Sequence, residues 1–410
     1  MKAVLSYKKS KEVSATIQVS GSKSESNRLL ILQSQFPNLK TENLSESDDT
    51  MVLQKALMSK KGEVNIHHAG TAMRFLTAYF ATRPDASVVL TGSERMQQRP
   101  IKILVDALRD LGAEISYLKN DGYPPIAISG TEITKNTVSI AGNVSSQYIS
   151  ALLLIAPSLQ NGLTINIKGD ITSAPYLQMT ASLLRKIGVS CVFSENKIEV
   201  TPVSKIDDIA ILIESDWSSA SYFYSMVALS EAAEITLMGY FKNSLQGDSI
   251  LATIYDLLGV STYYDEENAS ISLSKNNKPI ADHVLLNLVD TPDIAQTIAV
   301  TCFGLGLGCK LTGLHTLKIK ETDRLLALKT ELEKLGAKVT VTNETLELVA
   351  SKEINENVTI QTYNDHRMAM AFAPLALKQT IHINDAGVVS KSFPTYWEDI
   401  QKTGINVDFK

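Results

Sequence analysis

Apolar and polar residues alternate from Val13 to Val19, and an unbroken apolar run follows at residues 29–32. Alternation with a period of two is typical of a strand, whereas a longer apolar segment after a polar start is typical of a helix. Between these two patterns lies the sequence Gly-Ser-Lys-Ser-Glu-Ser-Asn-Arg, residues 21–28. The pattern therefore predicts a strand, a short turn and the start of a helix.

A second pattern recurs along the chain, in which an amphipathic helix ends in glycine and a strand follows. Glycine accepts the left-handed conformation that often ends a helix. The near-equal spacing favours a duplicated supersecondary unit over coincidence. Six copies, each with about two helices and several strands, would fit two similar domains of three units. The five glycines are Gly112, Gly188, Gly259, Gly336 and Gly404, and a looser sixth copy is placed at Gly62.

The predicted helix start at residues 21–28 has the chemistry of an anion site. Free backbone N–H groups at a helix start attract anions. Lys23 and Arg28 add positive charge, and Ser24 and its neighbouring serines add hydroxyl donors. A phosphorylated or carboxylated small molecule would fit, although a capped helix with solvated charges explains this segment alone equally well. The Walker sequence Gly-x4-Gly-Lys-Ser/Thr does not occur in the chain.

Two more predicted helix starts suit anions. Ser-Ser-Gln at 145–147 precedes the apolar run 148–156, and its hydroxyl and amide donors suit a phosphate, although a serine cap explains the same pattern. Gly70 opens another helix and would let a ligand approach the backbone closely. His67 and His68 precede it, but nothing else in the segment supports a metal, so solvated or structural histidines are the preferred interpretation.

Three later segments add titratable groups. Thr291-Pro-Asp293 is a good helix start with Thr as N-cap, and Asp293 either complements the helix dipole, acts as a base or binds a substrate hydroxyl group. The tripeptide alone favours the dipole role. Residues 318–324 combine two Lys, one Glu and one Arg before the helix 325–335, which suggests acid–base and anion chemistry, or else a cap at Thr322 with solvated charges.

His366 and Arg367 stand at the first turn of an apolar helix. They offer a titratable donor and a two-pronged fork for a carboxylate or phosphate, a surface cap being the alternative. Arg99 and Lys391, taken alone, are interpreted as solvated loop charges.

Length, charge and cysteine content exclude several classes of protein. A chain of 410 residues usually forms two or three domains. A net charge of −5 argues against nucleic-acid binding. The three cysteines cannot all pair and have no metal-binding spacing, which suggests a reducing compartment. No apolar run reaches membrane-spanning length and no signal-peptide pattern begins the chain, so a cytoplasmic protein without membrane or nucleic-acid partners is expected.

Together these segments resemble the EPSP synthase family (3-phosphoshikimate 1-carboxyvinyltransferase). Each motif is weak alone, but ten of them occur in family order over nearly the whole chain. They are Gly-Ser-Lys-Ser-x-Ser-Asn-Arg (21–28), Ala-Gly-Thr-Ala-Met-Arg (69–74), Arg-Met-x-x-Arg-Pro (95–100), Ser-Ser-Gln (145–147), Ser-x-Pro-Tyr (173–176), Asp-x-Ser-Ser-Ala-Ser-Tyr (216–222), Pro-Asp (292–293), Lys-Glu-Thr-Asp-Arg (320–324), Asn-Asp-His-Arg-Met-Ala-Met (364–370) and Lys-x-Phe-Pro (391–394).

The resemblance implies an α/β (α+β) fold of two similar domains, each of three βαβαββ units, with the active site in the interdomain cleft. Residues 21–213 would form one domain and mainly bind shikimate 3-phosphate. Residues 1–20 and 214–410 would form a discontinuous second domain that carries the proton-transfer and phosphoenolpyruvate residues. Because the anion ligands are split between both halves of the sequence, the domains are expected to close on the substrates.

Such enzymes join the enolpyruvyl group of phosphoenolpyruvate to the 5-hydroxyl group of shikimate 3-phosphate and release phosphate through a tetrahedral intermediate. The reaction belongs to the shikimate pathway, which leads to chorismate and the aromatic amino acids. It needs an acid, a base and fixed positive charge, but no metal and no cofactor. A monomer is expected.

The resemblance also implies roles for individual residues. The catalytic candidates are Lys23, Asp293, Glu321 and His366. The shikimate 3-phosphate ligands would be Lys23, Ser24, Arg28, Ser145, Ser146, Gln147, Ser173, Tyr176, Asp293, Thr316 and Lys320. The phosphoenolpyruvate ligands would be Lys23, Gly70, Arg99, Gln147, Arg324, Arg367 and Lys391.

The chain departs from the family pattern at three positions. His68 and Thr316 stand where the family usually has Asn, which affects local polar contacts and not the reaction. Phe75 stands where Pro is usual and could reshape the helix behind Gly70. Gly70 is the small residue associated with sensitivity to glyphosate, which occupies the phosphoenolpyruvate site, so this chain is expected to be a glyphosate target.

Three alternatives compete with this interpretation. The sister transferase that acts on UDP-N-acetylglucosamine usually has Lys-Asn where this chain has Lys23-Ser24, and it has a loop cysteine, whereas this chain has no cysteine before Cys191. A non-catalytic phosphometabolite sensor need not keep the proton-transfer residues. An enzyme that processes RNA ends would be expected to have a basic excess and a nucleotide loop.

Overall fold

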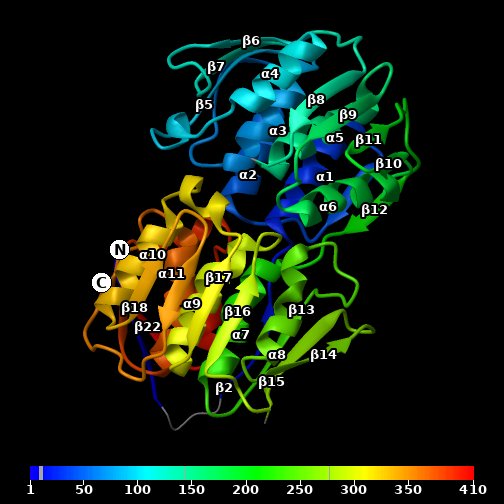
Figure 1. Cartoon of the computed structure of the whole chain (residues 1–410). Coiled ribbons are helices and arrows are strands. Elements are labelled where there is room, and N and C mark those ends of the chain that lie inside the picture. Colours follow the sequence, from blue (N-terminus) through cyan, green and yellow to red (C-terminus); the bar gives the residue numbers. More distant parts are fainter. Residues whose placement is uncertain (9–12, 144, 277) are drawn as a thin grey trace. The chain divides into compact units, whose positions relative to one another are not determined.

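The computed structural model describes residues 1–8, 13–143, 145–276 and 278–410. The chain divides into two compact units (Figure 1). Unit 1 comprises Met1–Gly21 and Glu214–Lys410, and unit 2 comprises Ser22–Ile213. Among the described residues, the strands form five four-stranded sheets and one two-stranded sheet. The mixed α/β architecture is the one that the sequence predicts.

Unit 2 contains two complete βαβαββ repeats. In each four-stranded sheet the first two strands are parallel and the last two pair antiparallel, in the orders β4-β5-β7-β6 and β8-β9-β11-β10. The first repeat is β4 (Lys61–Asn65), α3 (Gly70–Ala81), β5 (Ser87–Thr91), α4 (Lys102–Leu111), β6 (Glu114–Tyr117) and β7 (Ile126–Ser129). The second is β8 (Thr137–Ala141), α5 (Ser146–Ile155), β9 (Leu163–Lys168), α6 (Ala174–Lys186), β10 (Cys191–Ser194) and β11 (Lys197–Val200).

The third repeat of unit 2 is reduced. It contains α1 (Lys23–Gln35), β3 (Leu39–Glu42), α2 (Asp48–Ala56) and β12 (Ile209–Leu212), and its sheet has two parallel strands, β3 and β12. The strand that comes last in unit 2 therefore pairs with the first, which ties the two ends of the unit together.

Unit 1 contains three four-stranded repeats. The middle one is β16 (His283–Asn287), α9 (Ala295–Leu305), β17 (Gly308–Thr312), α10 (Arg324–Lys334), β18 (Lys338–Val341) and β19 (Leu346–Val349). Another consists of β2 (Val13–Gln18), α7 (Trp217–Leu229), β13 (Ala233–Met238), α8 (Leu251–Asp256), β14 (Val260–Asp265) and β15 (Ser270–Lys275). The last consists of β20 (Thr359–Ile360), α11 (His366–Phe372), β21 (Ile381–Ile383), α12 (Tyr396–Lys402), β22 (Ile405–Phe409) and β1 (Ala3–Tyr7).

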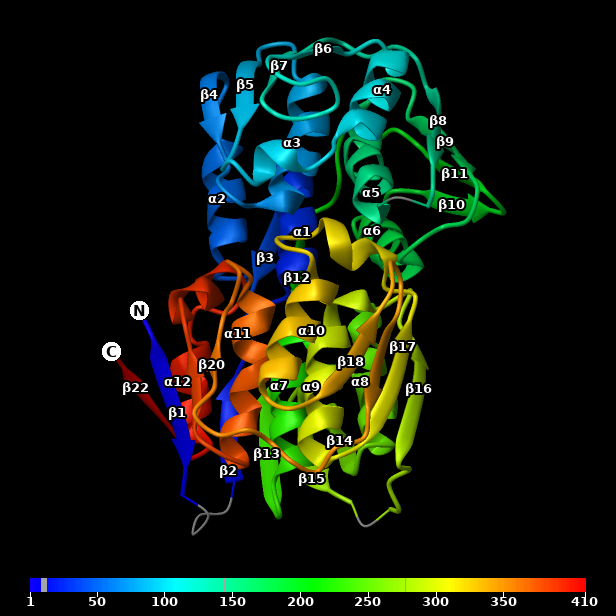
Figure 2. The same ribbon diagram turned by 60° about the vertical axis from the view of Figure 1, so that its left-hand side comes forward.

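The N-terminal segment of the chain completes two sheets of unit 1. β1 lies antiparallel between β21 and β22, and β2 pairs in parallel with β13 (Figure 2). The terminal residues are joined as well, because the backbone N–H groups of Lys2 and Lys410 each donate to the carbonyl group of the other residue. Unit 1 is therefore discontinuous in sequence but continuous in its hydrogen bonding.

The inner helices of both units are buried on all sides and mainly apolar. Every residue of α3 and α7 is buried, and α9 and α11 are buried over most or all of their length. A helix that is apolar around its circumference belongs in a core and not on a surface. Polar side chains in the middle of these helices are bonded inside the core, as Thr301 of α9 donates to Ser225 of α7, so the polar groups available to a ligand stand at the helix ends. This is why the polar motifs of the sequence stand at helix starts.

The five repeat glycines confirm the predicted joints. Each follows a helix within three residues, has a positive φ between +85° and +110°, and precedes a strand. The sixth copy was placed wrongly at Gly62. Helix α2 ends at Ala56, and Gly62 lies inside β4 with φ +87°. In the described parts of the chain, no helix has both the length and the apolar character needed to cross a membrane.

Candidate functional site

The motif-bearing helix starts lie close to where the sequence predicts them. α1 begins at Lys23, α3 at Gly70, α5 at Ser146 and α11 at His366. Ser145 caps α5 by accepting a hydrogen bond from the N–H group of Gln147. Apolar helices preceded by short polar residues are thus well signalled by local sequence.

The structure confirms the position of one predicted cap, Thr291, and corrects another, Thr322. Thr291 precedes the 3₁₀ helix η4 (Pro292–Ile294) with Pro at its first turn, but its side chain makes no capping hydrogen bond. The cap of α10 is Asp323 rather than Thr322, because the Asp323 side chain accepts from the N–H group of Leu326 at 3.1 Å. Thr322 and Asp323 both fit the sequence preference for a helix cap, and packing decides between them.

Arg324 is the centre of a charged cluster in unit 1. Its guanidinium group donates from Nε to Asp365 at 2.7 Å, from Nη1 to Asp293 at 2.9 Å and from Nη2 to Glu321 at 2.8 Å. The Arg324 side chain is 2% exposed. Burial disfavours its charge, but the three carboxylates outweigh burial and raise the pKa of Arg324 above its ordinary value. Because these contacts occupy most of its N–H donors, Arg324 mainly organises the carboxylates.

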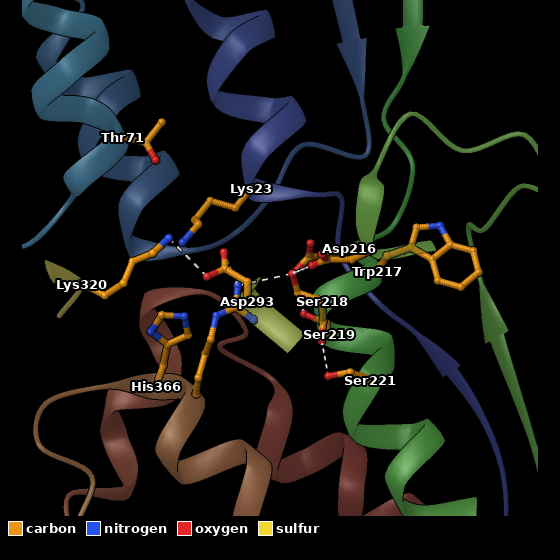
Figure 3. A network of polar contacts seen from close by, with 12 residues as sticks. Lys23, Thr71, Asp216, Trp217, Ser218, Ser219, Ser221, Asp293, Lys320 and His366 are labelled. Atoms are coloured by element: carbon orange, nitrogen blue, oxygen red, sulfur yellow. Dashed lines mark hydrogen bonds and ion pairs between the residues drawn. The ribbon is translucent and has the colours of Figure 1, made fainter. Parts of the chain in front are cut away.

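Asp293 forms ion pairs with cationic groups of Lys320, Arg324 and Arg367. Oδ1 lies 3.4 Å from Nζ of Lys320 (Figure 3). It also lies 2.9 Å from Nη1 of Arg324, and Oδ2 lies 3.2 Å from Nη2 of Arg367. Complementing the helix dipole, the role favoured by the tripeptide alone, therefore does not account for the contacts of Asp293. Asp293 is part of an ion-pair network whose members come from three separate motifs.

Glu321 and Lys391 form the other edge of this network. Nζ of Lys391 donates to Oε1 of Glu321 at 2.8 Å, while Oε2 of Glu321 accepts from Arg324. Lys391 is 3% exposed, so its interpretation as a solvated loop charge is wrong. Local sequence gave no sign of this, because Lys391 is buried by contacts with residues far away in the chain.

Arg367 keeps donor capacity for a ligand. Its Nη2 atom contacts Asp293 and donates to the hydroxyl group of Ser218 at 3.3 Å, whereas its buried Nε has no hydrogen-bond partner within the described residues. Burial disfavours the charge of Arg367, but Asp293 and other acidic neighbours raise its pKa well above the ordinary value. The surface-cap alternative is wrong, because Arg367 is only 7% exposed.

His366 and Thr316 are also buried in unit 1. Nδ1 of His366 lies 3.7 Å from Oδ1 of Asp365, and the side chain is 1% exposed. Thr316 lies in the 3₁₀ helix η5 (His315–Ile319), and its buried hydroxyl oxygen has no hydrogen-bond partner in the described part of the chain. We call Asp293, Lys320, Glu321, Arg324, His366, Arg367 and Lys391 the acid–base cluster.

Sequence reasoning assigned no role to Asp365, although the residue stands in a quoted motif. It caps α11 by accepting from the N–H group of Arg367 at 2.9 Å, and its carboxylate also holds Arg324. Before it, Tyr363 and Asn364 both have a left-handed backbone, with φ +55° and +54°. Consecutive left-handed residues other than glycine are costly, so the surrounding contacts must impose this turn.

Unit 2 gathers the other predicted residues around the start of α1. Nζ of Lys23 lies 3.4 Å from Asp49, an acid that sequence reasoning missed. Arg28 is 2% exposed and donates to Thr180, Ser150 and the carbonyl oxygens of Ser24 and Tyr176. Burial lowers the pKa of Arg28 to about 10, while Tyr176 and Glu25 act in the opposite direction. Arg28 is therefore tied into the fold of unit 2.

Phe75 supports Arg28 from another side. The centre of the Arg28 guanidinium group lies 5.4 Å from the ring centroid of Phe75 and 5.8 Å from that of Tyr176. Cation–π contacts of this kind favour the charged form. Helix α3 runs unbroken through Phe75, so the departure from the family's proline adds a contact to Arg28.

Gly70, Arg99 and Gln147 lie near one another at the starts of α3 and α5. A Cβ atom built on Gly70 would lie 2.5 Å from Nη1 of Arg99, so only glycine fits with this arginine in place. Nε2 of Gln147 donates to Oγ1 of Thr71 at 3.3 Å, which brings the two helix starts together. Ser146 is buried in the first turn of α5.

Ser173 precedes α6 in a left-handed conformation, with φ +56°, and Tyr176 lies in the first turn of that helix. The carbonyl oxygen of Tyr176 accepts from Arg28, so this motif also faces the start of α1. We call Lys23, Ser24, Arg28, Gly70, Arg99, Ser145, Ser146, Gln147, Ser173 and Tyr176 the anion cluster. Most of its members come from helix starts that are spread along the chain between Lys23 and Ala174.

No group of three or more His, Cys, Asp or Glu side chains suited to a metal ion occurs among the described residues. His67 and His68 are exposed. What the acid–base cluster offers chemically is two carboxylates held by one guanidinium group, together with buried cations and a histidine. This arrangement can move protons and stabilise anionic groups at the same time.

Comparison with known proteins identifies the family to which the chain is similar. Residues 35–400 match the family model of EPSP synthase (3-phosphoshikimate 1-carboxyvinyltransferase). A 3-phosphoshikimate 1-carboxyvinyltransferase of Bacteroides fragilis is 47% identical over 401 residues, which cover 97% of each chain, and one of Shewanella pealeana is 36% identical over 94% of this chain and 96% of the relative. A solved EPSP synthase of Acinetobacter baumannii shares the fold with a TM-score of 0.79 over the full length of both chains, at 20% identity. The motifs, the fold and these relatives together show that this chain belongs to the EPSP synthase family.

Proposed function

We propose that this chain transfers the 1-carboxyvinyl group of phosphoenolpyruvate to the 5-hydroxyl group of shikimate 3-phosphate and releases phosphate. The observation that carries the proposal is the pair of carboxylates around Arg324. Asp293 and Glu321 bind the same guanidinium group at 2.9 and 2.8 Å, next to Lys320, Arg367 and Lys391. Family membership supports the identity of the two substrates.

The reaction requires two proton movements. The acceptor hydroxyl oxygen bonds to C2 of phosphoenolpyruvate and loses its proton to a base, while C3 receives a proton from an acid. The tetrahedral intermediate then loses phosphate and a methyl proton, which restores the vinyl group. Asp293 and Glu321, with Lys23, are the proposed proton-transfer groups. Their fixed ion pairs would hold them in place without reorganisation during the reaction.

The two anionic substrates need cationic and N–H donors. For phosphoenolpyruvate we assign Arg367, whose Nε is unpaired among the described residues, and Lys391, which carries further N–H donors beyond its bond to Glu321. Arg324, Arg99, Lys23, Gly70 and Gln147 complete that proposed set. Proposed ligands of shikimate 3-phosphate are Lys23, Ser24, Arg28, Ser145, Ser146, Gln147, Ser173, Tyr176, Asp293, Thr316 and Lys320.

His366 is the proposed support for charge near the leaving phosphate. We assign phosphoenolpyruvate binding and proton transfer mainly to residues of unit 1, and binding of shikimate 3-phosphate mainly to unit 2. We also propose that the protein acts as a monomer in the cytoplasm. The three cysteines are buried and free, which supports a reducing compartment such as the cytoplasm. Light scattering during size-exclusion chromatography tests the monomer.

The experiment that tests the function is phosphate release. The protein is given phosphoenolpyruvate with shikimate 3-phosphate, and in parallel phosphoenolpyruvate with UDP-N-acetylglucosamine. Release only with the shikimate compound is the expected result. Release only with the nucleotide sugar would assign the chain to the sister activity. No phosphate release with either acceptor, together with calorimetric binding of shikimate 3-phosphate, would point to a sensor.

A further inference from the structure

A buried acid outside the proposed ligand set lies two hydrogen bonds from the acid–base cluster. Asp248 is in the 3₁₀ helix η3 (Gly247–Ile250), directly before α8, and is 4% exposed. Its Oδ2 atom accepts a short hydrogen bond from the hydroxyl group of Ser218, and its Oδ1 atom has no hydrogen-bond partner within the described residues. A buried carboxylate with so little compensation is costly, which suggests a role other than stability.

Ser218 connects Asp248 to Arg367. A serine hydroxyl group has one proton to donate and two lone pairs to accept with. Ser218 gives its proton to Asp248 and accepts from Nη2 of Arg367 at 3.3 Å. The same Nη2 lies 3.2 Å from Oδ2 of Asp293, a residue that Figure 3 shows together with Ser218. As long as the Asp248 carboxylate accepts the hydrogen bond from the Ser218 hydroxyl group, a lone pair of the Ser218 oxygen faces Arg367.

We propose that Asp248 is a positioning residue that acts through the Ser218 hydroxyl group and holds the Arg367 guanidinium group in the orientation that receives phosphoenolpyruvate. The inference rests on the proposed function. Asp248 touches no substrate in this scheme. It fixes the direction of one hydroxyl proton, and this in turn decides whether Ser218 attracts or repels the N–H group of Arg367.

The protonation state of Asp248 controls the same arrangement. Burial raises the pKa of Asp248 to about 7; Asp293 and Asp216 act in the same direction, whereas Ser218 and Arg367 lower it. Above that pH the carboxylate accepts from Ser218. Below it, the protonated carboxyl group can donate to Ser218, which frees the serine proton to turn toward Arg367.

The other titratable groups on the elements packed against η3 either have partners elsewhere or keep their proton between pH 6 and pH 8. On α8, Tyr255 is bonded to Thr301 and Asp256 pairs with Lys278. On α7, Tyr224 is bonded to Thr262, the cap residue Asp216 accepts from Ser219, and burial raises the pKa of Tyr222 to about 12. Asp248 is therefore the group in this neighbourhood whose proton bears on Ser218.

The test uses Asp248→Asn, Ser218→Ala and the double variant of the full chain. The Michaelis constant for phosphoenolpyruvate is measured at saturating shikimate 3-phosphate and pH 8, together with the constant for shikimate 3-phosphate. Each single variant is expected to raise the constant for phosphoenolpyruvate about tenfold, while that for shikimate 3-phosphate stays within twofold. Because both substitutions break one chain of contacts, the double variant should lose no more than either single variant.

Asp399→Asn is the matched control. Asp399 is a buried acid of the same unit, 2% exposed, and its partners are Lys402 and Thr395, outside the acid–base cluster. Its substitution should leave both Michaelis constants unchanged. A purely structural role of Asp248 would instead lower the melting temperature and affect both substrates alike.

The pH series provides a second readout. The ratio of the phosphoenolpyruvate constants of Asp248→Asn and the unsubstituted protein should fall toward one between pH 8 and pH 6, because the native acid becomes protonated. An unchanged Michaelis constant for phosphoenolpyruvate in Asp248→Asn at pH 8 would overturn the inference. It would also be overturned if the increases caused by the two single substitutions multiplied in the double variant. If Asp248→Asn does not fold, Ser218→Ala carries the same pH test. Absence of phosphate release from the unsubstituted protein would instead contradict the proposed function.

Discussion

Gly70 and Arg99 fit together only because position 70 has no side chain. An added Cβ atom would lie 2.5 Å from Nη1 of Arg99 and 3.0 Å from its Cζ and Nη2. Gly70→Ala should therefore push the guanidinium group aside while leaving the fold intact, because the displaced group is the end of a flexible side chain. We expect the Michaelis constant for phosphoenolpyruvate to rise roughly tenfold, the effect of losing about one charge-assisted contact. Steady-state kinetics at saturating shikimate 3-phosphate measures it.

Gly387→Ala is the control for that substitution. A Cβ atom at position 387 would meet only Cε of Met1, at 3.6 Å, an ordinary contact. Its kinetics should match those of the unsubstituted protein. An unaltered constant for Gly70→Ala would show that Arg99 does not bind this substrate.

Glyphosate should compete with phosphoenolpyruvate in this protein, because position 70 is the small residue that leaves Arg99 undisturbed. Initial rates at several concentrations of both compounds measure the competition. Failure of glyphosate to compete even at high concentrations would reject this prediction, and Phe75 behind the same helix start would then be the first position to exchange.

Glu321→Ala should separate binding from turnover. The substitution removes the carboxylate between Arg324 and Lys391 but leaves the anion cluster of unit 2 unchanged. We expect calorimetric binding of shikimate 3-phosphate to persist and turnover to fall by about 10²–10⁴, the usual contribution of a general acid or base.

The exposed Glu333 on α10, the helix that begins three residues after Glu321, pairs with Lys329 and provides the control variant Glu333→Ala. It should keep full activity. Loss of shikimate 3-phosphate binding by a folded Glu321→Ala would make Glu321 an organiser of ligands and not a proton-transfer group.

Glu331 should stabilise the strained turn before α11. Its buried carboxylate accepts from the hydroxyl group of Tyr363 at 2.6 Å and from the N–H group of Gln361 at 3.1 Å, and it pairs with Lys334. Burial and Glu331 together raise the pKa of Tyr363. Glu331→Gln should lower the free energy of unfolding by about 1–3 kcal/mol and reduce turnover, because the turn leads directly to Asp365, His366 and Arg367.

Denaturant unfolding and phosphate release measure these two effects. Tyr363→Phe should reproduce a part of both, whereas Tyr263→Phe, at a tyrosine that is 72% exposed, should reproduce neither. Loss of stability without loss of activity in Glu331→Gln would show that the turn does not position the acid–base cluster.

Asp248 should make the protein less stable as pH rises. Its pKa is raised to about 7 in the folded protein, so the folded state binds this proton more tightly than the unfolded chain does. The stabilisation is therefore complete below the unfolded pKa and is lost as pH rises toward 7. As pH rises from 4 to 8, the free energy of unfolding of Asp248→Asn should increase by about 2–4 kcal/mol relative to that of the unsubstituted protein. Urea unfolding across that range measures it, and a difference independent of pH would contradict it.

The sequence signalled the helix starts and helix ends, because these depend on neighbours within a few residues. Apolar periodicity located α1, α3, α5 and α11, and a left-handed glycine closed the five repeat helices. The same local rules could not choose between Thr322 and Asp323 as the cap of α10, and they misplaced the sixth joint at Gly62. Either choice satisfies the nearest backbone groups, so packing has to decide.

The candidate residues themselves were visible in the sequence, since each motif carries its own charged or hydroxyl groups. Their partners were not. Asp49, Asp248 and Glu331 belong to ordinary local sequence and gain meaning only from the residues that lie against them. The sequence around a candidate residue does not reveal a carboxylate partner that lies far away in the chain.

By itself, the sequence determined the repeated helix–glycine–strand unit and the chemistry at each helix start. Only the tertiary structure decided which charges are buried and which are paired. Arg324 joins Asp293, 31 residues before it, to Asp365, 41 residues after it, and Glu321 binds Lys391 from 70 residues away. Removal from water makes an unpaired charge costly and a paired one effective, and that balance depends on the folded neighbourhood and not on the order of residues along the chain.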